Sequence, residues 1–264
     1  MIFQKNKYFQ ISSVSSNRLV TGNALAFIAI FLFAAGFPAA EVLLEIWHPI
    51  TLMFFRLLLA VSTLVIIWIL LEGLPSVLKA PWLKGIKIGL LGFGLGTNLL
   101  LFAQWFTDPI TVALLATLIP VSATILEVWD RRRKLNTKFI LGLLASIIGG
   151  FIAVSENISI DLGWGVLMAL ASGFCFMWAS DKSVTKLSGL SSIARSSITF
   201  TGAAVFTTIS FLVLFNLGLI EIPNKITTNQ LFSLIIYSVI SMAISQVFFI
   251  LFDLLMLSMI KILN

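Results

Sequence analysis

Eight long apolar segments divide this chain, and each is long enough to cross a lipid bilayer as a helix. A hydrocarbon core about 30 Å thick needs about 20 consecutive apolar residues of helix, with a range of roughly 17–25. The segments of this length are 24–46, 50–71, 85–106, 109–129, 139–155, 162–180, 196–217 and 231–252. Charged residues make up only 11% of the sequence, less than half of the roughly 25% found in soluble domains. The sequence therefore predicts an all-α polytopic membrane helical bundle.

The first apolar segment is expected to stay in the mature protein as a membrane span. Lys5, Lys7 and Arg18 precede it, as basic residues precede a secretory signal peptide. The apolar part of a signal peptide is only about 7–15 residues long, and small residues follow it at the cleavage site. This segment is longer, and its alanines lie within it. Strands are not expected, because a membrane barrel alternates lipid-facing and lumen-facing residues, whereas these segments are apolar on all sides.

Positive charge is distributed unevenly between the loops. With the N-terminus in the cytoplasm, 15 of the 17 Lys and Arg residues fall in cytoplasmic segments, Lys225 falls in an outer loop, and Arg56 falls within a span. Cytoplasmic loops of membrane proteins are enriched in Lys and Arg. The net charge of +6 therefore indicates a topology rather than nucleic-acid binding. The cytoplasmic set is Lys5, Lys7, Arg18, Lys79, Lys84, Lys87, Arg131, Arg132, Arg133, Lys134, Lys138, Lys182, Lys186, Arg195 and Lys261.

The same topology predicts two inverted repeats. Segment 22–41 can be laid on segment 163–182, with Phe33 over Phe174 and Ala34 over Cys175. Five spans precede the second copy, and because five is odd, the two copies enter the membrane from opposite sides. We therefore expect three regions: a cytoplasmic N-terminal segment at 1–21, a first repeat at 22–156 and a second repeat at 157–264.

Short motifs of proline, glycine and polar residues recur through the first repeat. They are Gly36-Phe37-Pro38-Ala39-Ala40-Glu41 in span 1, Pro49 with Phe55-Arg56 in span 2, Thr111, Ala113, Ala116, Pro120, Val121 and Asp130-Arg131 in span 4, and Gly142 with Gly149-Gly150 in span 5. With these motifs the chain resembles the drug/metabolite transporter superfamily, in its ten-span EamA branch, over about residues 22–250. The resemblance implies a permease in which two inverted repeats rock around a central cavity. It also implies that the solutes are small metabolites, amino acids or drugs, often exported.

The second repeat is short in comparison with that family. Counted from its first span near residue 163, it has 102 residues, about 33 fewer than the 135 of the first repeat. The tail after the eighth span, Asp253–Asn264, has 12 residues, fewer than the roughly 17 needed to cross. The resemblance therefore implies eight of the family's ten spans and a C-terminal truncation. A truncated, non-transporting membrane protein is the alternative to a working transporter.

Ionisable groups inside spans are the first candidates for function, because each costs at least about 2.5–3.5 kcal/mol at the centre of a membrane helix. Arg56 lies seven residues past Pro49, or about 10 Å along the helix. Glu41 lies about five residues from the same outer end of the first span, so we expect the two to pair. Two interpretations stay open: a polar border of the solute path, and an ion pair that only fixes helix packing.

Other polar or helix-breaking residues complete the predicted solute pathway. Pro120 removes a backbone donor in the middle of the fourth span, and Thr117 could satisfy a freed group, so we expect a kink that faces the cavity. Gln246 is expected to face other helices, because an amide in hydrocarbon needs a partner. Tryptophans near span ends are more often interfacial anchors. The full candidate set is Glu41, Arg56, Gln104, Trp105, Thr117, Pro120, Trp178 and Gln246.

A membrane-embedded enzyme is the less favoured alternative. The single histidine, His48, is expected in an outer loop, so no histidine within a span could activate a serine or bind a metal. We therefore expect a non-enzyme without cofactor or metal, located in a bacterial inner (plasma) membrane with its N-terminus in the cytoplasm. The expected partners are a small-molecule solute and the lipid bilayer, without nucleic acid, and homo-oligomerisation is left open. Proton coupling through Glu41 is a hypothesis.

Overall fold

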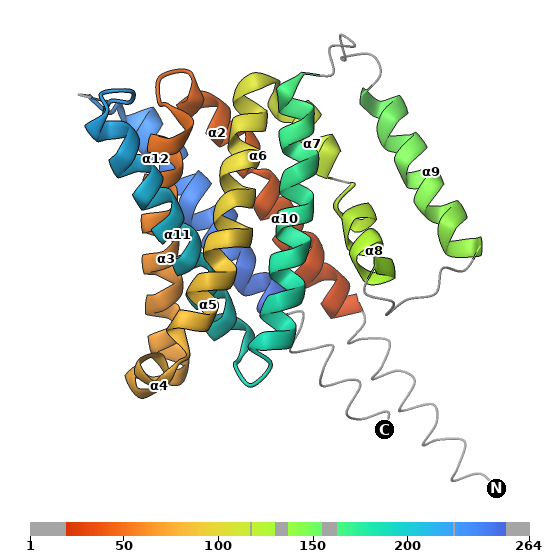
Figure 1. Ribbon diagram of the computed structural model, residues 1–264, viewed down its shortest axis with the longest axis horizontal. Helices are drawn as coiled ribbons and strands as arrows, with labels where there is room; N and C mark the ends of the chain where they lie inside the picture. Colours follow the sequence, from red (N-terminus) through yellow and green to blue (C-terminus); the bar gives the residue numbers. More distant parts are fainter. Residues whose placement is uncertain (1–19, 117, 130–136, 155–162, 224, 252–264) are drawn as a thin grey trace, which may run out of the picture.

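The computed structural model describes residues 20–116, 118–129, 137–154, 163–223 and 225–251 (Figure 1). Over these residues the chain is helical and has no strand, which confirms the all-α membrane bundle. Helix occupies each of the eight predicted segments. Within the described ranges, five helices are long and apolar enough to cross a membrane: Val20–Leu44, Pro49–Glu72, Trp82–Phe106, Ser192–Asn216 and Thr228–Leu251. Most of the N-terminal segment and the predicted partial ninth span lie outside the described residues.

Several of the predicted spans are interrupted rather than continuous. The elements are α2 (Gly36–Leu44), α3 (Pro49–Glu72), α4 (Leu74–Lys79), α5 (Trp82–Ile88), the π-helix η1 (Gly89–Gly94), α6 (Leu95–Phe106), α7 (Pro109–Ala116), α8 (Ile119–Trp129), α9 (Thr137–Val154), α10 (Trp164–Lys186), α11 (Ser192–Asn216), α12 (Thr228–Ile235) and the π-helix η2 (Ile236–Ile244). The third span therefore comprises α5, η1 and α6. The fourth comprises α7 and α8, and the eighth begins with α12 and η2.

Side-chain caps define where the long helices begin. Ser191 accepts a hydrogen bond from the backbone N–H of Ala194 at the start of α11. At the start of α12, Thr227 and Gln230 form a reciprocal capping box. Such caps satisfy backbone donors that the first turn of a helix leaves unpaired. The caps therefore fix the residues at which the seventh and eighth spans enter the bundle.

The bundle core joins spans that are far apart in the sequence. α10 packs along α6, and α11 packs against both η1 and α3, while η2 packs against α3 and α2. Figure 1 shows α9 at the margin of the bundle, beyond α7 and α8. The main apolar cluster includes Leu43, Leu57, Leu101, Ala203 and Tyr237, one each from α2, α3, α6, α11 and η2. Spans 1, 2, 3, 7 and 8 therefore share one core.

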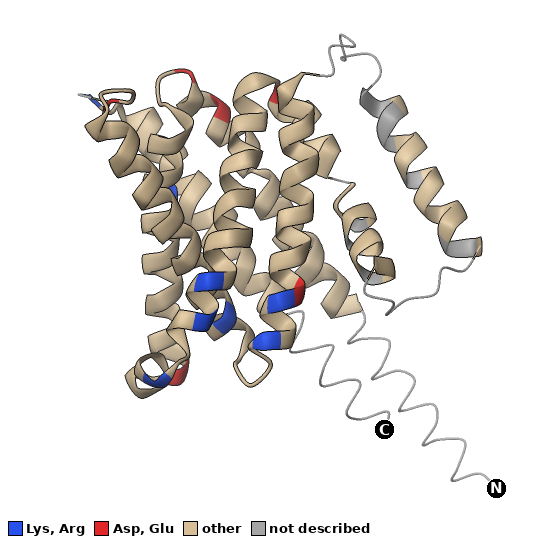
Figure 2. Ribbon diagram, in the orientation of Figure 1, with Lys and Arg blue, Asp and Glu red and all other residues tan. Residues whose placement is uncertain are grey.

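Charged residues separate towards the two ends of the bundle (Figure 2). Most Lys and Arg gather at the end that contains α4, α5, the last turn of α10 and the first turn of α11, whereas Lys225 lies between α11 and α12 and Arg56 lies within α3. Most acidic residues lie at the opposite end, near the α2–α3 and α6–α7 connections, although Glu72 and Asp181 lie at the basic end. The separation agrees with the loop charges from which the topology is predicted.

Candidate functional site

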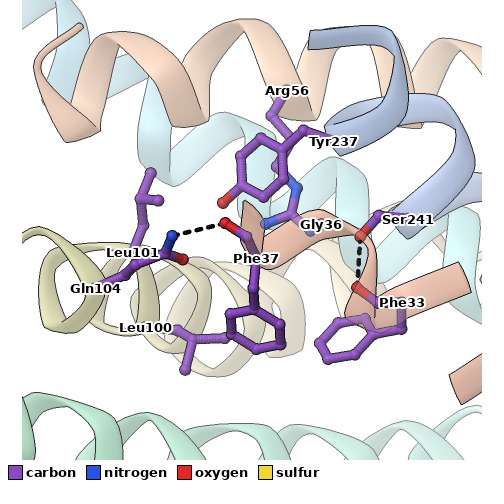
Figure 3. Close-up of a pocket in the computed structure, with 9 residues that line it drawn as sticks. All are labelled: Phe33, Gly36, Phe37, Arg56, Leu100, Leu101, Gln104, Tyr237 and Ser241. Atoms are coloured by element: carbon purple, nitrogen blue, oxygen red, sulfur yellow. Dashed lines mark hydrogen bonds between the residues drawn. The ribbon is translucent and has the colours of Figure 1, made fainter. Parts of the chain in front are cut away.

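The helix of the first span, Val20–Leu44, is interrupted for one residue at Ala35, three residues before Pro38, and this interruption is called the break below. A turn at Ala35 separates the preceding helix from α2, as expected where proline lacks a backbone donor and its ring collides with the preceding turn. Carbonyl groups near the break accept hydrogen bonds from other spans (Figure 3). Ser241 Oγ in η2 donates to the Phe33 carbonyl at 3.0 Å, and Gln104 Nε2 in α6 donates to the Phe37 carbonyl at 2.8 Å. The third and eighth spans are thereby tied to the break in the first.

A small cavity lies at this break, between the first span, α3, α6 and η2. Its volume is about 20 Å³, and one water molecule needs roughly 10–15 Å³. The cavity therefore has room for about one water in this conformation and is closed to larger solutes. Its lining residues are Phe33, Gly36, Phe37, Arg56, Leu100, Leu101, Gln104, Tyr237 and Ser241.

Arg56 is the charged residue of the cavity. It is only 6% exposed, and its guanidinium carbon lies 3.7 Å from the centroid of the Tyr237 ring. A desolvated cation–π contact contributes about 2 kcal/mol, whereas removing an ion from water costs several kcal/mol. Its Nε atom has no hydrogen-bond partner among the described residues. The ring therefore offsets only part of the desolvation cost of this guanidinium.

The predicted ion pair between Glu41 and Arg56 is wrong. Within the described ranges the only salt bridge is Lys182–Asp181, at 3.3 Å. The pair does not form because Glu41 is not on the face of α2 that packs against the bundle. The buried residues of α2 are Gly36, Ala39, Ala40 and Leu43, which follow the i, i+3, i+4, i+7 spacing of one helix face. Glu41 lies off this face and is exposed.

The π-helix η2 brings Tyr237 and Ser241 to the cavity, and both are buried. Gly36 permits this approach: an added Cβ atom would collide with Ser241 Oγ and lie 2.9 Å from Ser241 Cβ. π-helical segments within longer helices are frequent at functional sites. The close contact at Gly36 therefore sets how near the eighth span lies to the broken first span.

Two of the predicted pathway residues, Arg56 and Gln104, line the cavity. Trp105 does not. It is 43% exposed, and its ring packs edge-on against His48, with centroids 5.4 Å apart. Gln246 donates a 2.9 Å hydrogen bond to Ser196 Oγ, so the partner expected for this amide is present, but it joins the eighth span to the seventh.

The remaining predicted pathway residues lie in or near the fourth and sixth spans. Thr117 lies outside the described residues. α7 ends at Ala116 and α8 begins at Ile119, just before Pro120. The kink that faces the cavity at Pro120 stays a prediction. Trp178 lines a second cavity of about 470 Å³ between α8 and α10, together with Trp129 and Lys182.

Sequence reasoning missed the contributions of Tyr237, Ser241 and Phe33. A usable signal existed for Tyr237, because the sequence has only two tyrosines and a buried tyrosine usually needs a polar partner. Another missed residue is Asn98 in the third span, whose Nδ2 donates to Thr207 Oγ1 at 2.6 Å. An amide within an apolar span could have been predicted to join two helices.

Comparisons with known proteins identify the family. The EamA-like transporter family matches residues 20–155, which is more than half of the 264-residue chain. A search of curated proteins gives no match. Five chains of solved structures match. One of them, a crystal structure described only as that of a protein, has a TM-score of 0.63 at 16% identity, covering 88% of this chain and 78% of that chain, and it therefore supports the fold alone. The chain is an integral membrane protein that belongs to the EamA-like transporter family.

Proposed function

We propose that the protein carries small, largely apolar solutes across the membrane by alternating access, with the cavity at the broken first span as the solute site. Membership of a transporter family supports the transport of small solutes. The observation that carries the proposal is the convergence of three other spans on the break beside Pro38. Transporters typically bind solutes where discontinuous helices expose backbone groups to a cavity enclosed by protein.

The structure supports a closed conformation as one stage of this cycle. Small-molecule sites usually measure about 300–1,000 Å³, far more than the roughly 20 Å³ of this cavity. A solute could enter only after the first span separates from α6 and η2. The hydrogen bonds from Gln104 and Ser241 to this span would each contribute about 0.5–1.5 kcal/mol. Bonds of that strength can hold a closed state and still break in each cycle.

The proposed arrangement places the basic end of the bundle in the cytoplasm of a bacterial cell, with two inverted repeats spanning the inner membrane. The gathering of Lys and Arg around α4 and α5 supports this orientation. The two π-helices support the repeat. η1 begins seven residues into the helix Trp82–Phe106, and η2 begins eight residues into the helix Thr228–Leu251. In two five-span repeats these are the third and eighth spans, which are equivalent.

Counterflow in liposomes tests the proposed function. Vesicles with purified protein would be preloaded with one member of a panel of neutral amino acids and small amphipathic drugs, and uptake of the same labelled solute would be measured. At least one solute should accumulate. Gly36→Val should abolish accumulation, because its side chain would collide with Ser241, which also lines the cavity. Gly142→Val is the matched control, since an added Cβ there meets nothing within 4 Å. Equal transport by the two variants would place the solute path elsewhere.

Proton coupling through Glu41 is a separate part of the proposal. Its carboxylate lies on the exposed face of α2, near the acidic end of the bundle. Counterflow would be measured with and without a pH gradient, for the wild type and for Glu41→Gln. Transport that responds neither to the gradient nor to the substitution would remove this hypothesis and leave facilitated transport.

A further inference from the structure

Arg56 is a buried cation without an anionic partner in the part of the chain that the structure describes. The one salt bridge among those residues joins Lys182 to Asp181 at the basic end of α10. Tyr237 contacts Arg56 through its ring, at 3.7 Å. A ring face supplies partial negative charge but does not replace the oxygen acceptors that suit the N–H groups of a guanidinium. Among the residues that the structure describes, the Nε atom of Arg56 has no hydrogen-bond partner.

The surroundings of Arg56 distinguish it from the other polar groups of the cavity. Figure 3 shows its guanidinium behind the Tyr237 ring, on the side of Gly36. Gln104 and Ser241 already donate to backbone carbonyls of the first span. Arg56 is therefore the lining side chain with an unused buried donor.

The remaining wall of the cavity is apolar, formed chiefly by Phe33, Phe37 and Leu100. A guanidinium binds a carboxylate through two parallel charge-assisted hydrogen bonds. A single cation beside an apolar wall matches a solute with one carboxylate and an apolar body. It does not match a polyanion, whose further charges would have no partner in this lining.

We propose that Arg56 binds the carboxylate of the solute, so that the site selects small apolar monocarboxylic acids. The proposal rests on the cavity's proposed role as the solute site and names its substrate class. Because the closed cavity has room for only about one water, the carboxylate must bind after the first span separates from α6 and η2. Contact with Tyr237 holds the guanidinium in the cavity until the solute arrives.

Thermal melting of the full chain in detergent tests the inference without requiring transport. The probes are three acids, each paired with its own amide: propanoate, 4-methylpentanoate and 3-phenylpropanoate. A ligand that binds the folded state raises the melting temperature, and the rise increases with the logarithm of the ratio of ligand concentration to Kd. At least one acid should raise it, and the matching amide should not. Sodium chloride at equal ionic strength is the control for a general anion effect.

Variants of α3 connect the melting shift to Arg56. Arg56→Gln should weaken the effective acid by about tenfold or more, since it removes charge-assisted hydrogen bonds. Arg56→Lys should weaken it less, because the charge remains but the two-pronged geometry is lost. Ser62→Ala, exposed on the same helix, should respond as the wild type does. Should Arg56→Gln fail to fold, Arg56→Lys and the acid–amide comparison carry the test.

The inference is overturned if no acid raises the melting temperature, or if an acid and its amide raise it equally. It is also overturned if sodium chloride raises the melting temperature as much as the acids do, or if the acids raise it as much in the Arg56 variants as in the wild type. The proposed function can fail separately. Acid binding that depends on Arg56, with no solute moved in counterflow, would leave this site standing and refute transport. Counterflow that shows no preference for acids over amides would leave transport standing and refute the binding of a carboxylate by Arg56.

Discussion

At the scale of single residues, Gly36 controls the contact between the first span and η2. Gly36→Ala should displace Ser241 from the Phe33 carbonyl, because the added methyl group collides with Ser241 Oγ. Overpacking of this kind destabilises a core by about 1–3 kcal/mol, which a thermal melt would record. Gly142→Ala should be neutral or slightly stabilising, since the added atom meets nothing within 4 Å. Equal losses at the two glycines would contradict this account.

His48 should make the start of α3 sensitive to acid. Its Nδ1 accepts a hydrogen bond from the backbone N–H of Ile50 at 3.2 Å, and burial lowers the pKa of the imidazole below 6.5. As the pH falls, the imidazole of the unfolded chain is therefore protonated before that of the folded chain. The free energy of unfolding is highest above about pH 6.5 and decreases below that pH.

The melting temperature should accordingly fall between about pH 7.5 and about pH 5.5, and by less in His48→Asn, whose amide caps the helix without titrating. His48→Ala, which removes the cap, should lower the free energy of unfolding by about 0.5–1 kcal/mol near neutral pH. Parallel pH curves for the wild type and His48→Asn would rule out this role of His48.

Sequence reasoning could place Arg56 and Gln104 at the site, because charges and amides within apolar spans must face other protein. It could not pair Arg56 correctly. The inward face of α2 depends on the turn at Ala35, and Tyr237 reaches the guanidinium from a span about 180 residues further along the chain. Such contacts arise from packing between helices, which local sequence patterns do not specify.

At the scale of elements, the third span depends on close backbone contact with α11. A Cβ added to Gly202 would lie 2.9 Å from Gly89 Cα, and one added to Gly89 would lie 3.0 Å from Gly202 Cα. Small residues allow membrane helices to approach in this way. Gly202→Leu should push η1 from α11 and lower the free energy of unfolding by about 1–3 kcal/mol. Gly149→Leu, with open space around it, is the control, and equal melting temperatures would contradict the prediction.

The lengths of the apolar segments were sufficient to predict the spans, and Pro120 pointed to a kink in the fourth span, where α7 and α8 are separate helices. The π-helices were not predictable in the same way. A π-helix differs from an α-helix in hydrogen-bond register, and the apolar sequences of η1 and η2 do not specify that register. Their positions coincide with close contacts to α11 at Gly89 and to α2 near Ser241, and these contacts exist only in the folded bundle.

At the scale of the whole molecule, the separation of charge predicts which loops face the cytoplasm. In a Cys175→Ala background, Glu221→Cys should react with a membrane-impermeant maleimide on intact cells. Ser188→Cys, at the basic end, should react only after the cells are permeabilised. Both positions are exposed in the structure, so burial would not protect either. The reverse labelling pattern would invert the proposed orientation.

The central claim is that the cavity at the broken first span opens to water and admits the solute. The direct measurement is the reaction of Leu100→Cys with a small, charged, membrane-impermeant thiol reagent, again in a Cys175→Ala background. Leu100 lines the cavity, whereas Leu91, on the same span, is 61% exposed on the surface of the bundle. Leu100→Cys should react, and a transported solute should slow the reaction, while Leu91→Cys stays inert in lipid. An inert Leu100→Cys in protein that still transports would contradict the account.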